Sequence, residues 1–311
     1  MLYPLKFKTI HVHTAWEGSH LNNNAITENS TSPIGEQWLI SGVQDSISTI
    51  SEGTLEDNTL QELVEVYMGD LVGDKVYEKF GIEFPLLVKL LDIGQEMDLQ
   101  VHPDDETALE RHNAYGRTKM WYVLDAAPDA EITLGFKNNS TRLEYLYNKN
   151  KGTLSQILNK IPVSKGECFF IPAGTIFSAK GCYIAEIQQT SDITYYIENE
   201  LDTELATDVI NFDKQNLLIT YDTKENNSTK LIDCKYFTAN YLRFNKEIEK
   251  EYINIDSFVI YLCTTGEFEL KFDLNQSISV TAGECILIPA YLKDILLEPK
   301  KESSLIEVYI S

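Results

Sequence analysis

The sequence predicts a mostly-β protein built from two barrel-like domains. Short apolar or alternating runs bounded by Gly, Pro, Asn or Asp are typical of strands. The clearest of these runs cover residues 84–92, 119–125, 168–172 and 182–188. One eight-residue pattern also occurs twice, which indicates two domains of one type. A length of 311 residues is enough for two domains with sizeable cores.

The repeated pattern joins a turn to a buried strand. The segment from Gly166 to Ala173 recurs from Gly283 to Ala290, with six of the eight positions identical. In both copies a Gly-Glu turn leads into an apolar strand that ends at proline. Many short strands with Gly and Pro punctuation fit jelly-roll barrels of the cupin kind. The alternative is chance similarity between two strand-and-turn units.

Helical insertions are predicted in the first domain. Thr59 and Glu62 have the spacing of a capping box, and apolar residues follow at helical spacing up to Leu71. A second helix is predicted near residues 153–160, ended by Pro162. The polar stretch of residues 213–230 has weak periodicity and is typical of a linker. We therefore expect an N-terminal domain at residues 1–212 and a C-terminal domain at residues 231–311.

Charge and hydropathy exclude several classes of partner. The formal net charge is −22, so neither nucleic acid nor an anionic membrane surface is an expected partner. The sequence has no run of about twenty apolar residues that would predict a membrane span. A phosphorylated small molecule is still allowed as a ligand, because salt screens the bulk field beyond about 8 Å.

Cysteine usage indicates a reducing compartment. The five cysteines are odd in number, have no C-x-x-C spacing and lie mostly in apolar runs. Buried free thiols are therefore favoured over disulfides or a metal site. Residues 1–10 alternate apolar and basic side chains without an apolar core, which predicts a first strand rather than a targeting segment. We expect a cytoplasmic protein.

Two motifs point to a metal site. Gln100 and His102 precede a Pro-Asp turn, and on a strand their side chains point to the same face. If that face is a barrel interior, both can bind one metal ion; the alternative is a polar strand end with a solvated histidine. The second motif, from Gly166 through Pro172 and Gly174 to Phe177, has cupin spacing. Such motifs normally end in histidine, and phenylalanine has no lone pair for a metal.

The chain resembles the class I mannose-6-phosphate isomerases of the short bacterial type. The resemblance rests on collinear segments in the first two thirds of the chain, namely residues 1–7, 34–38, 85–105, 116–124 and 166–195. The last third matches only in architecture. The resemblance implies two cupin barrels, a zinc cofactor, a sugar-phosphate ligand, and conversion of mannose 6-phosphate to fructose 6-phosphate.

The resemblance also implies four zinc-ligand positions, of which two are substituted. The family's glutamine and first histidine fall at Gln100 and His102, which are retained. Its glutamate falls at Lys119 and its last histidine at Phe177. A lysine charge about 4 Å from a zinc ion is repelled by roughly 8 kcal/mol at an effective dielectric near 20. A complete structural zinc site contributes only roughly 10–16 kcal/mol, so we expect zinc to be absent or weakly bound.

Of the substrate-binding and catalytic positions that the resemblance implies, two keep the family's charge or residue and two are substituted. Asp98 stands where the family has a serine that contacts phosphate, whereas Arg117 keeps the charge of a substrate-binding lysine. Glu186 is the retained family glutamate, and Tyr196 stands where the family has an arginine. The resemblance places Glu186 and Tyr196 at catalytic positions and Asp98 and Arg117 at substrate-binding positions.

These substitutions lead to two hypotheses. Aldose–ketose isomerisation needs a Lewis acid or equivalent charge on the sugar oxygens and a base that moves a proton. We favour a weak or inactive isomerase that binds a sugar phosphate or has a regulatory or structural role. The alternative is a working isomerase with an atypical metal site. Lys119 either supplies charge to an oxyanion or, as we favour, fills the ligand space and pairs with a carboxylate such as Glu186. The sequence does not indicate the oligomeric state.

Overall fold

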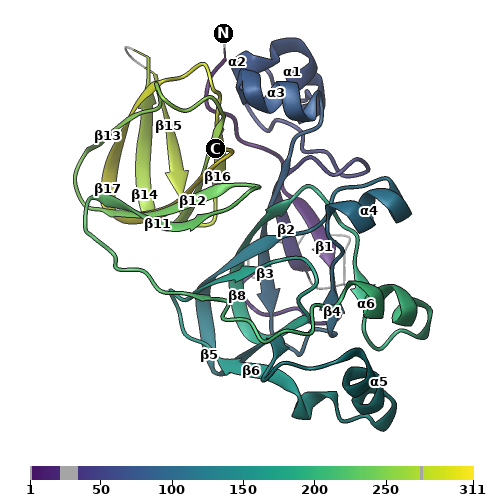
Figure 1. Cartoon of the computed structure of the whole chain (residues 1–311). Helices are drawn as coiled ribbons and strands as arrows, with labels where there is room; N and C mark the ends of the chain where they lie inside the picture. Colours follow the sequence, from purple (N-terminus) through teal and green to yellow (C-terminus); the bar gives the residue numbers. More distant parts are fainter. Residues whose placement is uncertain (1, 22–33, 274–275) are drawn as a thin grey trace. The chain divides into compact units, whose positions relative to one another are not determined.

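The structure is a computed structural model that describes residues 2–21, 34–273 and 276–311. Within these ranges, strands dominate and form two antiparallel sheets, and short helices occur in the segments that connect strands along the chain (Figure 1). The predicted mostly-β architecture with two sheets of cupin type is therefore confirmed.

The chain divides into two compact units. The site unit comprises His11–Trp38 and Leu87–Ile219, and the C-terminal unit comprises Met1–Ile10, Leu39–Leu86 and Thr220–Ser311. Residues 39–86 thus group with the C-terminal sheet, although the sequence prediction placed them in a domain of residues 1–212. Which segments fold together as independent domains stays a prediction.

The sheet of the site unit brings together strands from the middle of the chain. Its order is β1 (Ile10–His13), β2 (Ile34–Ser41), β3 (Leu86–Ile93), β8 (Phe177–Gln189), β5 (Lys119–Phe136), β7 (Cys168–Ile171) and β10 (Leu218–Ile219). Figure 1 shows β3, β8 and β5 side by side, as this order requires. Three short strands lie off this path: β4 (Gln100–Val101) pairs with β8 and with β9 (Tyr195–Tyr196), and β6 (Leu158–Pro162) pairs with β5.

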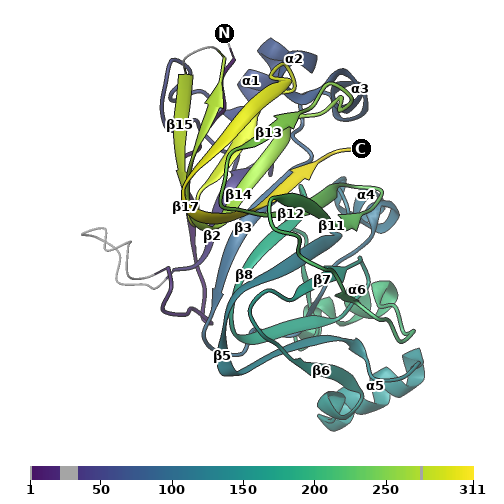
Figure 2. The ribbon, with the colours of Figure 1, turned by 90° about the vertical axis from the view of Figure 1, so that its left-hand side faces the viewer.

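The C-terminal unit has a sheet of the same type. Its order is β11 (Asn227–Asp233), β12 (Thr238–Phe244), β17 (Asp294–Tyr309), β14 (Val259–Phe272) and β15 (Gln276–Thr281), with β13 (Ile248–Glu251) on β17 and β16 (Cys285–Ile288) on β14. Figure 2 shows β17, β14 and β15 side by side. This unit also holds the helices α1 (Leu60–Tyr67), α2 (Gly69–Val72) and α3 (Asp74–Phe80).

The predicted capping box at the start of α1 is confirmed. The Thr59 hydroxyl accepts a hydrogen bond from the Glu62 N–H, and the Glu62 carboxylate accepts one from the Thr59 N–H at 2.8 Å. These bonds satisfy two backbone donors that the first helical turn leaves without partners.

The internal repeat forms the same structure twice. Strands β7 and β16 each follow a glycine with φ of +89°, Gly166 and Gly283. The Gly166 N–H donates to the Val123 carbonyl at 2.8 Å, and the Gly283 N–H donates to the Cys263 carbonyl at 2.9 Å. Because side chains with a Cβ disfavour this φ, glycine is required at both turns. The matching bonds also make Val123 and Cys263 equivalent positions of the two sheets.

The helix predicted near residues 153–160 is wrong. A short 3₁₀ turn, η1 (Leu154–Gln156), leads instead into β6, where Ile161 pairs with Ile132 of β5. The helix lies earlier, as α5 (Arg142–Lys151), and is bounded by a Thr141 N-cap and by Gly152 with φ of +66°. Strand pairing with β5 overrides the helical spacing of the apolar residues.

The remaining helices also lie in the site unit. They are α4 (Asp105–His112), η2 (Glu200–Asp202) and α6 (Thr203–Val209). The strand predicted for residues 1–10 is wrong, because Leu5 and Phe7 form only isolated bridges and β1 begins at Ile10. Pro4 has no N–H with which to extend a ladder.

The cysteines in the structure are free thiols, as the sequence led us to expect. All five cysteines are free, and four of them are buried. Burial raises the pKa of the Cys168 thiol to about 12, so this thiol stays protonated and unreactive at neutral pH. No helix in the described part of the chain is long and apolar enough to span a membrane.

Candidate functional site

Four strands of the site unit bring the predicted site positions together. Gln100 lies on β4, where its register partners are Phe177 at the start of β8 and Tyr196 on β9. On the central pair of strands, Trp121 of β5 is opposite Glu186 of β8. The ligand positions implied by the family resemblance therefore meet at neighbouring strand ends.

Lys119 lies between a carboxylate and an aromatic ring. Its side chain is 2% exposed, and its Nζ lies 3.0 Å from Glu186 Oε2. On another side, Nζ lies 3.5 Å from the centroid of the Phe177 ring. An ion pair and a cation–π contact thus hold the same ammonium group. The favoured expectation that Lys119 pairs with Glu186 is confirmed.

His102 faces an aromatic ring where the family resemblance implies a second imidazole. The ring centroids of His102 and Phe177 are 4.7 Å apart and meet edge to face. His102 Nε2 also lies 3.4 Å from the Thr194 hydroxyl oxygen. Burial, together with the positive charges of Arg117, Lys119 and Lys89, holds the pKa of His102 well below its ordinary value. The imidazole is therefore neutral at neutral pH.

Glu186 is the buried anion at the centre of the site. It is 1% exposed and lies 2.9 Å from Lys89 Nζ and 3.0 Å from Lys119 Nζ. The Trp121 Nε1–H donates a further hydrogen bond of 2.5 Å to it. Burial alone raises the pKa of Glu186, but the charges of Lys119, Lys89 and Arg117 outweigh burial and hold the pKa far below its ordinary value.

Lys89 and Glu36 are site residues that the sequence analysis missed. Lys89 Nζ lies 3.0 Å from Glu36 Oε2, and Glu36 also accepts a 2.8 Å hydrogen bond from Trp38 Nε1–H. The sequence did contain a signal, because Lys89 is the single charged residue in the apolar run of residues 84–91. A lysine in such a buried strand requires an anionic partner. The partners Glu36 and Glu186 come from different strands.

Arg117 is held by neutral side chains. It is 8% exposed, its Nε–H donates to Gln188 Oε1 at 2.9 Å, and its Nη1–H donates to the Thr194 hydroxyl at 2.7 Å. Its Nη2 lies 3.9 Å from Glu186. The guanidinium therefore adds positive charge near Glu186, and Gln188 and Thr194 accept hydrogen bonds from two of its N–H groups.

Asp98 and Tyr196 do not take part in this buried network. Asp98 is exposed and lines a separate pocket. The Tyr196 side chain is 41% exposed, and its backbone N–H donates to Asp202 at 3.0 Å. The catalytic and substrate-binding roles that the resemblance gives these positions stay predictions.

The side chains present do not make a complete zinc site. Among the described residues, no three His, Cys, Asp or Glu side chains have the spacing of metal ligands. Gln100 and His102 offer one amide oxygen and one imidazole nitrogen, whereas Phe177 offers no lone pair and a charged Lys119 only donates. Zinc sites in proteins supply three or four ligands around a tetrahedral ion. This donor set therefore does not fit the ion.

The C-terminal unit contains a matching buried glutamate. Glu307 of β17 is opposite Tyr261 of β14, two residues before Cys263, just as Glu186 is opposite Trp121, two residues before Val123. Glu307 is 3% exposed, accepts a 2.5 Å hydrogen bond from the Tyr252 hydroxyl and lies 2.7 Å from Lys250 Nζ. Both sheets thus bury a glutamate that an aromatic donor and a lysine neutralise.

Comparison with known proteins identifies the family. The phosphomannose isomerase type I catalytic domain matches residues 6–137. Mannose-6-phosphate isomerase ManA of Bacillus subtilis is 31% identical over 255 residues, which cover 76% of this chain and 78% of that protein. The chain belongs to the mannose-6-phosphate isomerase family.

Other members of the mannose-6-phosphate isomerase family match over nearly the whole chain. The probable mannose-6-phosphate isomerase GmuF of Bacillus subtilis is 28% identical over 96% of this chain and 97% of its own length. The crystal structure of the mannose 6-phosphate isomerase from Bacillus subtilis matches with a TM-score of 0.85 and 25% identity, over 98% of this chain and 99% of that chain. The fold of the last third is therefore also shared with the family.

Replacing Glu186 should destabilise the protein strongly. Glu186→Gln leaves Lys119 and Lys89 buried with less negative charge, and breaking a buried pair costs about 3–5 kcal/mol. The double variant Lys119→Met/Glu186→Gln removes one of these cations and should be more stable than Glu186→Gln alone. Urea unfolding measures both differences.

A matched control comes from a more exposed pair of the same unit. Glu131 lies 2.9 Å from Lys160, and their side chains are 37% and 34% exposed. Glu131→Gln should cost at most about 1 kcal/mol. Equal costs for Glu186→Gln and Glu131→Gln would show that the buried network contributes nothing special to stability.

Lys119 should also give a specific pH dependence. Burial lowers its pKa to about 7, with Arg117 and Lys89 lowering it further and Glu186 opposing them. Its pKa in the unfolded chain is about 10.4. Between these values the unfolded chain binds a proton that the folded chain does not bind, so unfolding free energy rises with pH, by up to about 1.4 kcal/mol per unit.

The measurement is urea unfolding of the unmodified protein and of Lys119→Met between pH 6 and pH 10. The unfolding free energy of the unmodified protein minus that of the variant should be flat below about pH 7 and should rise above it. A difference that falls as the pH rises through this range would contradict the lowered pKa of Lys119.

Proposed function

We propose that this chain is a mannose-6-phosphate isomerase family protein with weak or no zinc-dependent isomerase activity, and that it serves as a binding or regulatory homologue. The observation that carries this proposal is the position of the Lys119 ammonium, 3.0 Å from Glu186 and 3.5 Å from the Phe177 ring centroid. A side-chain cation therefore contacts the ring of Phe177, which stands at a zinc-ligand position that the resemblance implies. We propose that zinc is absent or weakly bound as a result.

The chemistry of isomerisation supports the same proposal. A base must accept a proton from one sugar carbon and return it to the next. Glu186 is a poor base here, because two lysines and Trp121 hold its carboxylate and its pKa is far below the ordinary range. His102 is buried and neutral, and its Nε2 lies near the Thr194 hydroxyl. Neither group combines an accessible position with a pKa near neutrality.

Retained residues support binding more than catalysis. Arg117 keeps a positive charge near the site, which suits a ligand of the sugar-phosphate class implied by the family. Its guanidinium is already bound by Gln188 and Thr194, so an anionic ligand must replace at least one of these bonds. The free and mostly buried cysteines support our proposal of a cytoplasmic location.

The alternative function is that of a working isomerase with an atypical metal site. It is favoured by the retention of Gln100, His102 and Glu186 and by the names of the relatives, which are mannose-6-phosphate isomerases. In that case Lys119 would leave Glu186 when a metal ion and a sugar bind. The two functions differ in metal content and turnover.

The unmodified protein should contain no stoichiometric zinc and should turn over mannose 6-phosphate far below the ordinary enzyme range of about 1–1000 per second. Elemental analysis after dialysis against a weak chelator measures the metal, and a coupled fructose 6-phosphate assay measures turnover. A relative with full activity, assayed in parallel, controls for the assay. One retained zinc per chain together with ordinary turnover would establish the alternative function.

Restoring the substituted ligands should restore zinc binding cooperatively. Lys119→Glu and Phe177→His together rebuild a Gln, His, Glu, His set, so the double variant should bind zinc much more tightly than either single variant. Isothermal calorimetry measures this affinity. Adding Asp98→Ser and Tyr196→Arg should then raise isomerase activity above background.

A third substitution controls for the site of binding. His102→Ala in the double variant removes one rebuilt ligand and should abolish the regained affinity. If the two single substitutions act additively, or if His102→Ala changes nothing, the four positions do not form one metal site.

A further inference from the structure

A short strap of the site unit, residues 16–21, is fastened to the end of β3. Trp16 is half-buried and packs against the apolar core of that unit. Its carbonyl accepts hydrogen bonds from the N–H groups of Gly94 and Gln95, at 2.9 and 3.2 Å, directly after β3. Backbone bonds thus join the strap to the segment that follows this strand.

Two glycines let the strap approach β3 closely. A Cβ added at Gly18 would lie 2.0 Å from Asp92 Oδ1, and one added at Gly94 would lie 2.5 Å from the Glu17 carbonyl oxygen. Non-bonded carbon and oxygen atoms repel strongly at such distances. Neither position therefore accepts a larger residue without a shift of its neighbours.

The strap supplies partners for a buried carboxylate. Asp92 of β3 is 2% exposed, and the Leu21 N–H donates to its Oδ2 at 2.8 Å. His20 Nδ1 lies 3.2 Å from the other oxygen, Oδ1. Because a buried carboxylate is costly without such partners, the position of the strap and the burial of Asp92 depend on each other.

His20 bridges two carboxylates on different strands. Its Nε2 lies 3.1 Å from Asp125 Oδ2 of β5, while Nδ1 faces Asp92. A neutral imidazole carries one N–H, whereas the protonated ring carries two. Both contacts can therefore be hydrogen bonds only when His20 is protonated. A neutral ring turns a lone pair towards one of the two carboxylates.

Tyr183 faces the bridge from β8, and the charge of Lys165 acts on Asp125. The Tyr183 ring stacks on His20, with centroids 4.7 Å apart and an interplanar angle of 1°. Burial and the negative charge of Asp92 raise the pKa of Tyr183 to about 12, so its hydroxyl is neutral at neutral pH. The hydrogen bond with His20, opposed by burial and aided by Lys165, holds the pKa of Asp125 below its ordinary value. The Asp125 carboxylate thus stays charged and attracts the protonated ring.

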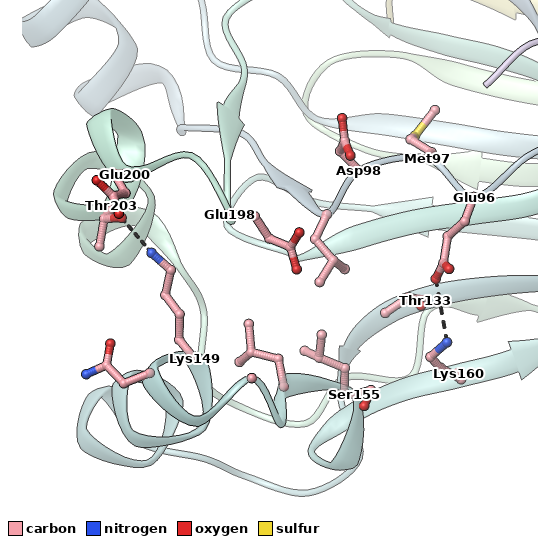
Figure 3. Close-up of a pocket in the computed structure, with 15 residues that line it drawn as sticks. Glu96, Met97, Asp98, Thr133, Lys149, Ser155, Lys160, Glu198, Glu200 and Thr203 are labelled. Carbon is pink, nitrogen blue, oxygen red and sulfur yellow. Dashed lines mark hydrogen bonds and ion pairs between the residues drawn. The ribbon is translucent and has the colours of Figure 1, made fainter. Parts of the chain in front are cut away.

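The strap also fastens the segment that leads to the candidate site. Residues 94–99 run from the strap to β4, which begins at Gln100. Figure 3 shows Glu96, Met97 and Asp98 of this segment in the wall of a pocket. A change in how firmly the strap is held can therefore reach both this wall and β4.

We propose that His20 is a proton-controlled latch. The protonated imidazole fastens the strap to Asp92 and Asp125, and loss of the proton loosens the strap and the segment of residues 94–99. Because the fastened strap favours the protonated ring, the strap is held most firmly at low pH. It is held less firmly as the pH rises through the range of about 5 to 8, in which imidazole side chains ordinarily change charge. The inference goes beyond the proposed loss of isomerase activity and does not depend on it.

Amide hydrogen exchange of the full-length protein, followed by NMR, tests the latch. The reporters are the N–H groups of Leu21 and Gly94, which make hydrogen bonds of the strap. The Val123 N–H, bonded to the Glu167 carbonyl in the same unit, is the reference for overall stability. After correction for the intrinsic exchange rate, protection of the reporters relative to Val123 should fall about tenfold from pH 5 to pH 8, because a charge-assisted bond weakens. Relative protection that is independent of pH, or that rises, would overturn the inference.

Two matched variants assign the effect to His20. His20→Gln keeps a side-chain donor but cannot change its charge, so its relative protection should change less than about twofold over the same range. His11→Gln removes another histidine of the same unit, an exposed residue whose Nε2 lies 3.3 Å from the Gln37 amide nitrogen. This variant should keep the full fall. A full fall in His20→Gln, or loss of the fall in His11→Gln, would contradict a latch at His20.

Asp125→Asn tests whether both carboxylates are needed. The Asp125 side chain is 54% exposed, so its substitution leaves the buried core intact. A neutral His20 can then donate to Asp92 without facing a second carboxylate, and the fall should shrink to less than about threefold. An undiminished fall would show that the bridge to Asp125 plays no part, and the two-carboxylate latch would be wrong.

Discussion

The carboxylate of Glu186 is almost fully buried, and the structure of the site unit depends on neutralising it. An isolated buried charge costs several kcal/mol, so cationic or hydrogen-bonding groups must surround it. Lys89, Lys119 and Trp121 supply these groups at 2.5–3.0 Å from three points on neighbouring strands. Glu36 then balances Lys89. Lys119 is part of this balance, so its removal would leave Glu186 with one fewer cationic partner.

The sheet of the C-terminal unit supports a structural role for Lys119. Glu307 occupies the equivalent position in the C-terminal unit and is likewise held by an aromatic donor and a lysine. A buried glutamate paired with a lysine therefore occurs in both sheets of this type. In the site unit, the substitutions that complete such a cluster also remove two ligand positions implied by the family.

The sequence was sufficient for features that depend on local patterns. The strands at residues 84–92, 119–125, 168–172 and 182–188 followed from residue type and spacing, as did the Gly166 and Gly283 turns and the capping box at Thr59. The pairing of Lys119 with Glu186 followed from these together with the family resemblance. Features that depend on contacts between distant segments did not follow. The helix expected before Pro162 does not form, because β6 pairs with β5 instead. Lys89 was missed because its partners, at positions 36 and 186, lie far from it in sequence. The pocket that Asp98 lines was missed for the same reason, since residues that lie far apart in sequence, from Glu96 to Thr203, form its wall.

We propose that Lys119, rather than a metal ion, neutralises the buried Glu186. Anomalous diffraction at the zinc absorption edge, from crystals grown with excess zinc, tests it most directly. If Lys119 neutralises Glu186, we expect its Nζ at hydrogen-bonding distance from Glu186 and no anomalous peak beside His102. A zinc peak about 2.0–2.1 Å from His102 Nε2, with the Lys119 side chain turned away from Glu186, would contradict it.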